Sequence, residues 1–172
     1  MRNLAPIIEQ LSRARAGLES AANAVPADLW RKPPRPGAWS AAEVIAHLTM
    51  VEGRITDGAA RLVAGRPPIV PIWKRLHWPV WLAEWRGARR ETPIPLDPNL
   101  VAEREEMLAR LAGLRRRTLE LLEANRGREL SAYRWPHPFF GSLNFYAWFR
   151  LVAHHEVRHT KQIREIIKSF QK

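Results

Sequence analysis

The sequence predicts an all-α protein, a four-helix up-down-down-up bundle with a long crossover connection between helices 2 and 3. Three observations predict it. Four segments carry apolar residues three, four or seven positions apart, which is the spacing of one buried helix face. Proline-rich stretches separate several of these segments, and proline cannot continue a helix. The connection between the second and third segments is long enough to return along the bundle, so those two helices can run parallel.

The first two helices are expected over about residues 2–24 and 40–64, separated by a proline-rich loop. Ser40 and Glu43 have the spacing of a capping box, in which each side chain satisfies a free backbone N–H of the first turn. Gly65 stands where a helix commonly ends. The inward face of the second helix includes His47.

The third and fourth helices are expected over about residues 98–125 and 142–169. Asp97 suits the N-cap position, and Pro98 suits the first helical position that follows. In the fourth segment the apolar stripe includes two histidines. Its members are Leu143, Ala147, Leu151, His155, His159, Ile163 and Ile166.

A Pro/Trp-rich insertion at about 66–97 joins the second and third helices, and residues 1–172 are otherwise expected to form one domain. Its stretch from 66 to 95 holds six of the 14 prolines and four of the eight tryptophans. We expect a short helix near residues 74–86, broken at Pro79. The tryptophans are expected to cover one end of the bundle or to form a partner surface.

Composition excludes several classes of protein and partner. The 172 residues include no cysteine, which excludes disulfides, thiolate zinc sites and cysteine nucleophiles. The absence of a long apolar run and of a visible signal peptide predicts a cytoplasmic protein that does not span a membrane. The net charge of +11 could attract polyanions, but 23 of the 28 cations are arginines spread along the chain. Nucleic acid is therefore not expected as a partner.

The histidines carry the strongest functional signal. His155 and His159 are four residues apart, so their imidazoles project from the same helix face. Together with His47 they would form a three-histidine site for one divalent metal ion, with a fourth position open to water or substrate. The competing interpretation is that they are hydrogen-bonded core residues. His154 is expected to face outward or to line a helix contact, and His77 and His137 receive no role.

Residues 155–159 also spell the H-E-x-x-H of zinc proteases, whose glutamate is a general base. Only 13 residues follow His159, and none is His, Asp or Cys, so the usual downstream third ligand is missing. Glu156 is therefore a surface residue or a candidate base beside a metal-bound water. Candidate residues for orienting the imidazoles are Gln162, Glu43 and Glu52. A single Glu-x-x-His is too few carboxylates for a di-iron site.

Two stretches resemble the DinB-like (damage-inducible) superfamily of metal-binding four-helix bundles, which includes bacterial thiol-dependent S-transferases. Residues 39–48 are similar to its W-S-x-x-E-x-x-x-H-L segment. Residues 137–143 and 155–163 are similar to its H-P-x-x-G-x-L and H-x-x-x-H-x-x-Q-I segments. The resemblance implies a metal, usually zinc or nickel, held by His47, His155 and His159. It also implies thiol conjugation, isomerisation or hydrolysis of small molecules.

The leading hypothesis is a divalent-metal-dependent enzyme that acts on a small molecule, as a thiol-dependent S-transferase or a hydrolase. A low-molecular-weight thiol is the expected cosubstrate. The alternative is a catalytically silent metal-binding or interaction protein, in which the tryptophan-rich segment forms a homodimer or partner surface. A third hypothesis, an anion or nucleic-acid binder, rests on charge alone.

Overall fold

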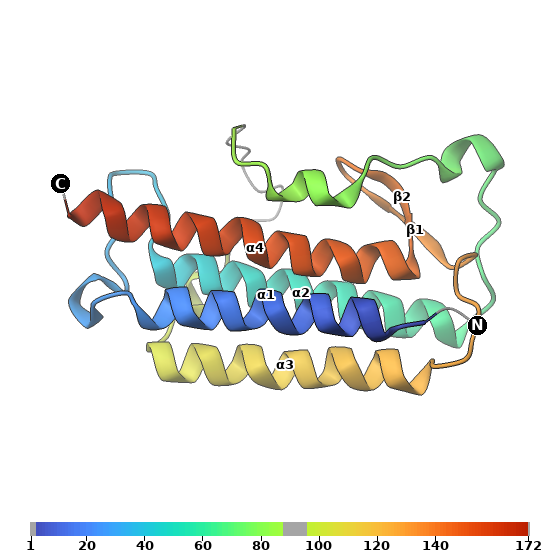
Figure 1. Cartoon of the computed structure of the whole chain (residues 1–172), viewed down its shortest axis with the longest axis horizontal. Helices are drawn as coiled ribbons and strands as arrows, with labels where there is room; N and C mark the ends of the chain where they lie inside the picture. The colour runs from blue at the N-terminus through green and yellow to red at the C-terminus, as the bar shows by residue number, and fades with distance from the viewer. Residues whose placement is uncertain (1–2, 88–95, 172) are drawn as a thin grey trace.

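Four long helices form the molecule in the computed structural model, which describes residues 3–87 and 96–171 (Figure 1). They are α1 (Ala5–Asn23), α2 (Ala41–Ala64), α3 (Arg104–Ala124) and α4 (Phe145–Phe170). In Figure 1, α1 and α4 run from right to left, whereas α2 and α3 run from left to right. Helices α2 and α3 are therefore parallel, which confirms the up-down-down-up bundle and its crossover.

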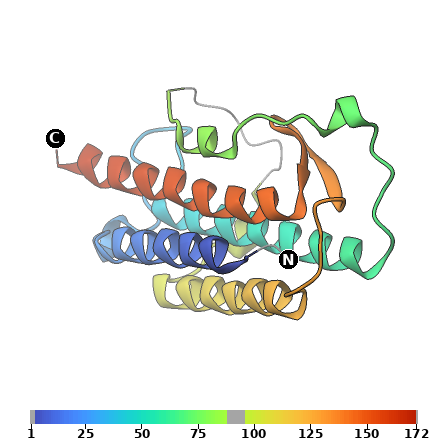
Figure 2. The ribbon, with the colours of Figure 1, turned by 45° about the vertical axis from the view of Figure 1, so that its right-hand side comes forward.

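The crossover leaves the end of α2, passes a β-hairpin and returns along α4 (Figure 2). It contains two short 3₁₀ segments, η2 (Ile72–Arg75) and η3 (Val80–Glu84), and η3 packs on α4. Pro79 separates the two as the N-cap of η3, where the sequence predicted a break. Residues 88–95 of the 66–97 insertion lie outside the described part of the chain.

Helix α2 begins and ends where the sequence predicts. Ser40 Oγ accepts from the Glu43 amide at 3.3 Å, and Glu43 Oε2 accepts from the Ser40 amide at 2.7 Å, so the capping box is present. The helix ends at Ala64, followed by Gly65 in extended backbone. Glu43 is thus occupied at the helix terminus.

Helix α3 begins six residues later than predicted, at Arg104 rather than Pro98. Residues Pro98–Leu100 make only a 3₁₀ turn, η4. Asp97 Oδ1 accepts from the Asn99 amide at 2.9 Å, which closes a local turn. The Trp30 indole N–H then donates to the Ala102 carbonyl at 3.0 Å, and Glu103 has the extended backbone of an N-cap. The Ala102 carbonyl thus bonds to a residue of the loop between α1 and α2, and α3 begins two residues later.

Helix α4 begins at Phe145 rather than Ser142 because the preceding residues form a hairpin that the sequence analysis missed. Strands β1 (Arg134–His137) and β2 (Gly141–Asn144) pair antiparallel, with Trp135 opposite Leu143. Gly141 has a φ of +84°, a conformation that favours glycine at the end of the turn. Asn144 then caps the helix by accepting from the Ala147 amide at 2.9 Å.

The apolar core has two parts, one toward each end of the bundle. One contains the first half of α1, the second half of α2 and the first half of α4. The other contains the second half of α1 and the first half of α2, with Met107 and Leu111 of α3 and Ile163 and Ile166 of α4. A layer of buried polar residues lies between these two parts on every helix. Its members are Arg15, Glu52, Thr56, Arg115, Thr118, Glu156 and Thr160.

None of the described helices is both long and apolar enough to cross a membrane.

Candidate metal centre

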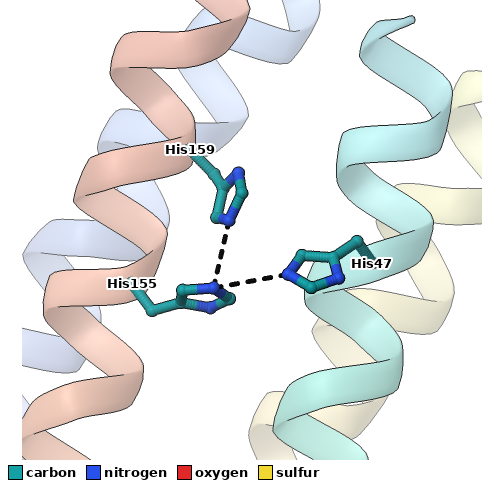
Figure 3. A group of neighbouring side chains, drawn as sticks. All are labelled: His47, His155 and His159. Carbon is teal, nitrogen blue, oxygen red and sulfur yellow. Dashed lines mark hydrogen bonds between the residues drawn. The ribbon is translucent and has the colours of Figure 1, made fainter. Parts of the chain in front are cut away.

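Three imidazoles from two helices converge at one point inside the bundle (Figure 3). His47 comes from α2, and His155 and His159 come from consecutive turns of α4. His155 Nε2 lies 3.0 Å from His159 Nε2 and 3.4 Å from His47 Nε2. One nitrogen from each ring lies within 4.8 Å of the other two, so this group could hold a metal ion.

Burial keeps these imidazoles neutral near pH 7. Desolvation lowers the pKa of His47 to about 4. Desolvation, with smaller contributions from neighbouring positive groups, lowers the pKa of His155 to about 3 and that of His159 well below its usual value. A neutral imidazole has a free lone pair, which is the form that binds a metal.

Hydrogen bonding aims the lone pair of His159 at the other two rings. Its Nδ1 lies 2.8 Å from Gln162 Oε1, which also accepts from Arg86 Nη1 at 3.3 Å. Because the amide oxygen faces both groups, His159 carries its proton on Nδ1 and leaves Nε2 free. This is the orienting contact that metal-binding histidines usually make. Gln162 is one of the three candidates for that role that the sequence offered.

His47 is held differently. Its ring packs against Trp39 with a centroid separation of 5.0 Å. Its Nδ1 is buried and has no hydrogen-bond partner among the described residues. Packing against Trp39 and the 3.4 Å contact of its Nε2 with His155 Nε2 therefore orient this ring.

The three rings fit a divalent metal in donor type, protonation and spacing. Nitrogen ligands lie about 2.0–2.1 Å from zinc, so two of them in a tetrahedral site are about 3.3 Å apart. The separations of 3.0 and 3.4 Å between the Nε2 atoms are close to that value. Three neutral nitrogen donors suit zinc or nickel better than magnesium or calcium, which prefer oxygen.

A cavity of about 1090 Å³ opens onto the three histidines. Five tryptophans line it, and two of these, Trp135 and Trp148, stack with centroids 4.9 Å apart and planes within 6°. Four arginines and one glutamate supply its charged groups within residues 3–87 and 96–171. A space of this size, mostly apolar with a few polar groups, is typical of a small-molecule site.

Glu156 does not line this cavity, although the sequence made it the candidate base. It is buried, so it is not a surface residue either. Its Oε1 accepts from Arg15 Nε at 2.9 Å, and its Oε2 lies 2.9 Å from Arg115 Nη2. Because these arginines belong to α1 and α3, the carboxylate faces the bundle interior. We therefore assign Glu156 no role as a base.

Glu52, a sequence candidate for orienting the imidazoles, belongs to the same buried layer. It accepts from Arg15 Nη2 at 3.0 Å, Arg115 Nε at 2.7 Å and Thr118 Oγ1 at 2.9 Å. The described contacts of Glu52 are thus with charged and hydroxyl groups rather than with the histidines. Glu43 is likewise occupied in the capping box.

His137 lines the cavity but received no role from the sequence analysis. Its Nδ1 accepts from the amides of Phe139 and Phe140 at 3.0 and 3.2 Å. Burial lowers its pKa to about 4, so the neutral ring carries its proton on Nε2. The two amides belong to the turn between β1 and β2. Because the sequence analysis did not predict this hairpin, it had no signal for the tautomer of His137.

A polar network attaches the crossover to α4 next to the histidines. Glu84 Oε1 lies 2.7 Å from His154 Nδ1, and Glu84 Oε2 accepts from Lys161 at 3.0 Å. His154 Nε2 lies 2.9 Å from the Gln10 amide nitrogen of α1. His154 therefore lines a helix contact, one of the two positions expected from sequence.

Comparison with known proteins connects this arrangement to one family. A family model described as the DinB superfamily matches residues 10–163. The uncharacterized protein YuaE of Bacillus subtilis (strain 168) is 27% identical over 146 residues, covering 78% of this chain and 80% of that protein. The crystal structure of TT2238, a four-helix bundle protein, aligns with a TM-score of 0.62 at 24% identity, covering 95% of this chain and 99% of that one.

Proposed function

Because the chain belongs to the DinB superfamily, we propose that it is a divalent-metal-dependent enzyme acting on a small molecule, of the thiol-dependent S-transferase or hydrolase type. One observation carries the proposal. Three neutral imidazoles converge at the wall of a large aromatic cavity. A purely structural metal site is normally closed by four protein ligands, whereas three ligands leave a position for substrate.

The proposed metal ligands are His47, His155 and His159, and the proposed ion is zinc or nickel. A bound divalent ion supplies a nucleophile near neutral pH, because it lowers the pKa of a thiol or a water. Gln162 holds the His159 ring in the tautomer that binds metal, and Arg86 holds Gln162. The apolar cavity wall limits water around the reacting groups.

His137 is the proposed hydrogen-bond donor to the substrate. Its Nδ1 is occupied by two backbone amides, so only its Nε2–H is available. An N–H donor of fixed orientation in an apolar cavity can stabilise negative charge that develops on a reacting oxygen.

The test is thiol consumption with the electrophile 1-chloro-2,4-dinitrobenzene and ester hydrolysis with 4-nitrophenyl acetate, each with zinc or nickel. We expect one activity to depend on the metal, to be lost on chelation and to be absent in His155→Ala. Replacing the exposed Arg61 by glutamine is the control and should leave the rate unchanged. Equal rates for wild type and His155→Ala would contradict the proposal.

Exposed apolar side chains on the crossover favour a second candidate, a catalytically silent protein with a homodimer or partner surface. Ile69 is fully exposed and Trp73 is 71% exposed. Large apolar groups clustered on a surface commonly mark an interface. Sedimentation of wild type and Trp73→Ser tests this, since a dimer through this surface should become monomeric in the variant. A monomeric wild type would remove the homodimer.

A further inference from the structure

We infer that the cavity binds a small organic anion with a flat apolar body, whose negative group is held by Arg54 and whose body lies against Trp135 and Trp148. This inference names a substrate class for the proposed function and rests on it.

Helices α2 and α4 run in opposite directions (Figure 1), and His47 Nε2 of α2 lies 3.4 Å from His155 Nε2 of α4. Arg54 lies seven residues after His47, and Trp148 lies seven residues before His155. Seven residues are about two helical turns, or about 10 Å along the axis. Because the helices are antiparallel, Arg54 and Trp148 therefore lie at the same level, and all four side chains line one cavity. The cavity thus has a histidine end and an arginine–tryptophan end.

The charge balance at this cavity favours an anion. Among the residues that the structure describes, its lining includes four arginines and a single acid, Glu165. Arg86 binds Glu165 through both oxygens, at 2.8 and 2.7 Å, so that carboxylate is already neutralised. Arg158 donates to the Trp85 carbonyl.

The Arg54 guanidinium has no ion-pair or hydrogen-bond partner among the described residues, and the same is true of the Arg35 guanidinium on the loop between α1 and α2. A guanidinium is a planar donor that binds carboxylate and similar anions with two parallel hydrogen bonds. Arg54 is therefore available to a ligand, with Arg35 as a second cation at the same cavity.

The apolar part of the ligand follows from the wall beside Arg54. The stacked rings of Trp135 and Trp148 are fixed by the Trp148 indole N–H, which donates to the Trp135 carbonyl at 3.2 Å. Two parallel indoles present a rigid apolar surface, and flat rings stack well on such surfaces. Leu151 and Val152 extend it toward the histidines.

The experiment compares two ligands of the same shape, 1-naphthaleneacetate and its uncharged amide, by calorimetric titration of the full chain. It is done on protein as purified and again with a chelator. The acid should bind at least about fivefold more tightly than the amide, and 0.5 M NaCl should reduce this preference for the acid.

Arg54→Gln should abolish the preference for the acid. Arg61→Gln, which removes the same charge from α2 outside the cavity, should retain it. Trp135→Leu should weaken acid and amide alike.

Equal binding of acid and amide to wild type would overturn the inference, as would a preference that survives in Arg54→Gln. A preference that disappears with the chelator but not with Arg54→Gln would also overturn it, because the anion would then bind the metal. The proposed function is judged separately, by metal content and metal-dependent turnover. An enzyme with bound metal and no acid preference refutes only the anion site.

Discussion

At the scale of single residues, the chemistry depends on the protonation of three histidines. Burial lowers the pKa of each, and the contact between His159 and Gln162 selects which nitrogen of that ring is free. The Gln162 side chain orients His159, whereas packing against Trp39 helps to orient His47. The Gln162 contact and the lowered pKa values lead to two separate predictions.

Replacing Gln162 by leucine should weaken zinc binding about 10- to 100-fold while leaving the three ligands in place. The reason is that His159 loses the acceptor that holds its tautomer and orientation. Competition with a chromophoric chelator measures the change. Gln171→Leu, at the exposed end of α4, is the matched control. An unchanged affinity in Gln162→Leu would show that the contact does not orient the ring.

Kept free of metal by a chelator, the protein should lose stability as the pH falls from about 6.5 toward 4. A histidine whose pKa is lowered on folding binds more protons in the unfolded chain over that range, so unfolding becomes more favourable as the pH drops. For His47 the shift from 6.5 to about 4 corresponds to a loss on the order of 3 kcal/mol. Thermal unfolding at pH 7.5 and 5 samples about 2 kcal/mol of this loss, because the folded-state pKa lies below 5. His47→Gln should show a smaller decrease, and an identical decrease would refute the assignment.

At the scale of helices, the buried charged layer joins all four. Arg15 from α1, Glu52 from α2, Arg115 from α3 and Glu156 from α4 form ion pairs of 2.7 to 3.0 Å. Because Glu156 adjoins His155, this layer sets the position of α4 along the bundle. It therefore helps to bring the α4 histidines level with His47.

Removing one arginine from that buried layer should strongly lower the free energy of unfolding. Arg115→Met leaves Glu52 and Glu156 with one arginine between them, and we expect a loss of about 3–5 kcal/mol in the free energy of unfolding. The same change at Arg117 on the same helix breaks only the exposed pair with Asp57 and should cost less than about 1 kcal/mol. Urea unfolding distinguishes the two. Equal losses would mean that the buried layer contributes no special stability.

Helix prediction from sequence succeeded where the pattern is local and failed where a tertiary contact decides. The capping box at Ser40 uses only neighbouring residues, so the start of α2 was predictable. The start of α3 depends on Trp30, 72 residues away from Ala102 in the sequence. The β-hairpin before α4 was missed because Ser142 and Leu143 fit the helical stripe as well as a strand.

The same distinction holds for the candidate site. The four-residue spacing of His155 and His159 is local, and the orienting role of Gln162 follows from its place one turn later. Glu156 was misjudged because its environment comes from Arg15 and Arg115, which lie on other helices. The spacing of H-E-x-x-H cannot show which way the glutamate faces within a bundle. Nor could it show the aromatic cavity, which draws on both loops and helices.

At the scale of the whole molecule, the crossover gives the bundle both its topology and its cavity. By returning along α4, it makes α2 and α3 parallel and brings Trp78, Leu82 and Trp85 to the cavity that contains the histidines. Glu84 and Arg86 anchor it to α4 through Lys161 and Glu165. The segment that departs most from a plain four-helix bundle thus shapes the access to the candidate metal.

The most direct test is the metal content of untagged protein, prepared without chelators, for wild type, His47→Ala and His155→Ala. The account predicts close to one divalent ion per chain in wild type and a loss of that ion in both variants, with helical content retained. Wild type that takes up no ion after incubation with zinc, nickel and manganese would contradict it. The three histidines would then be core residues.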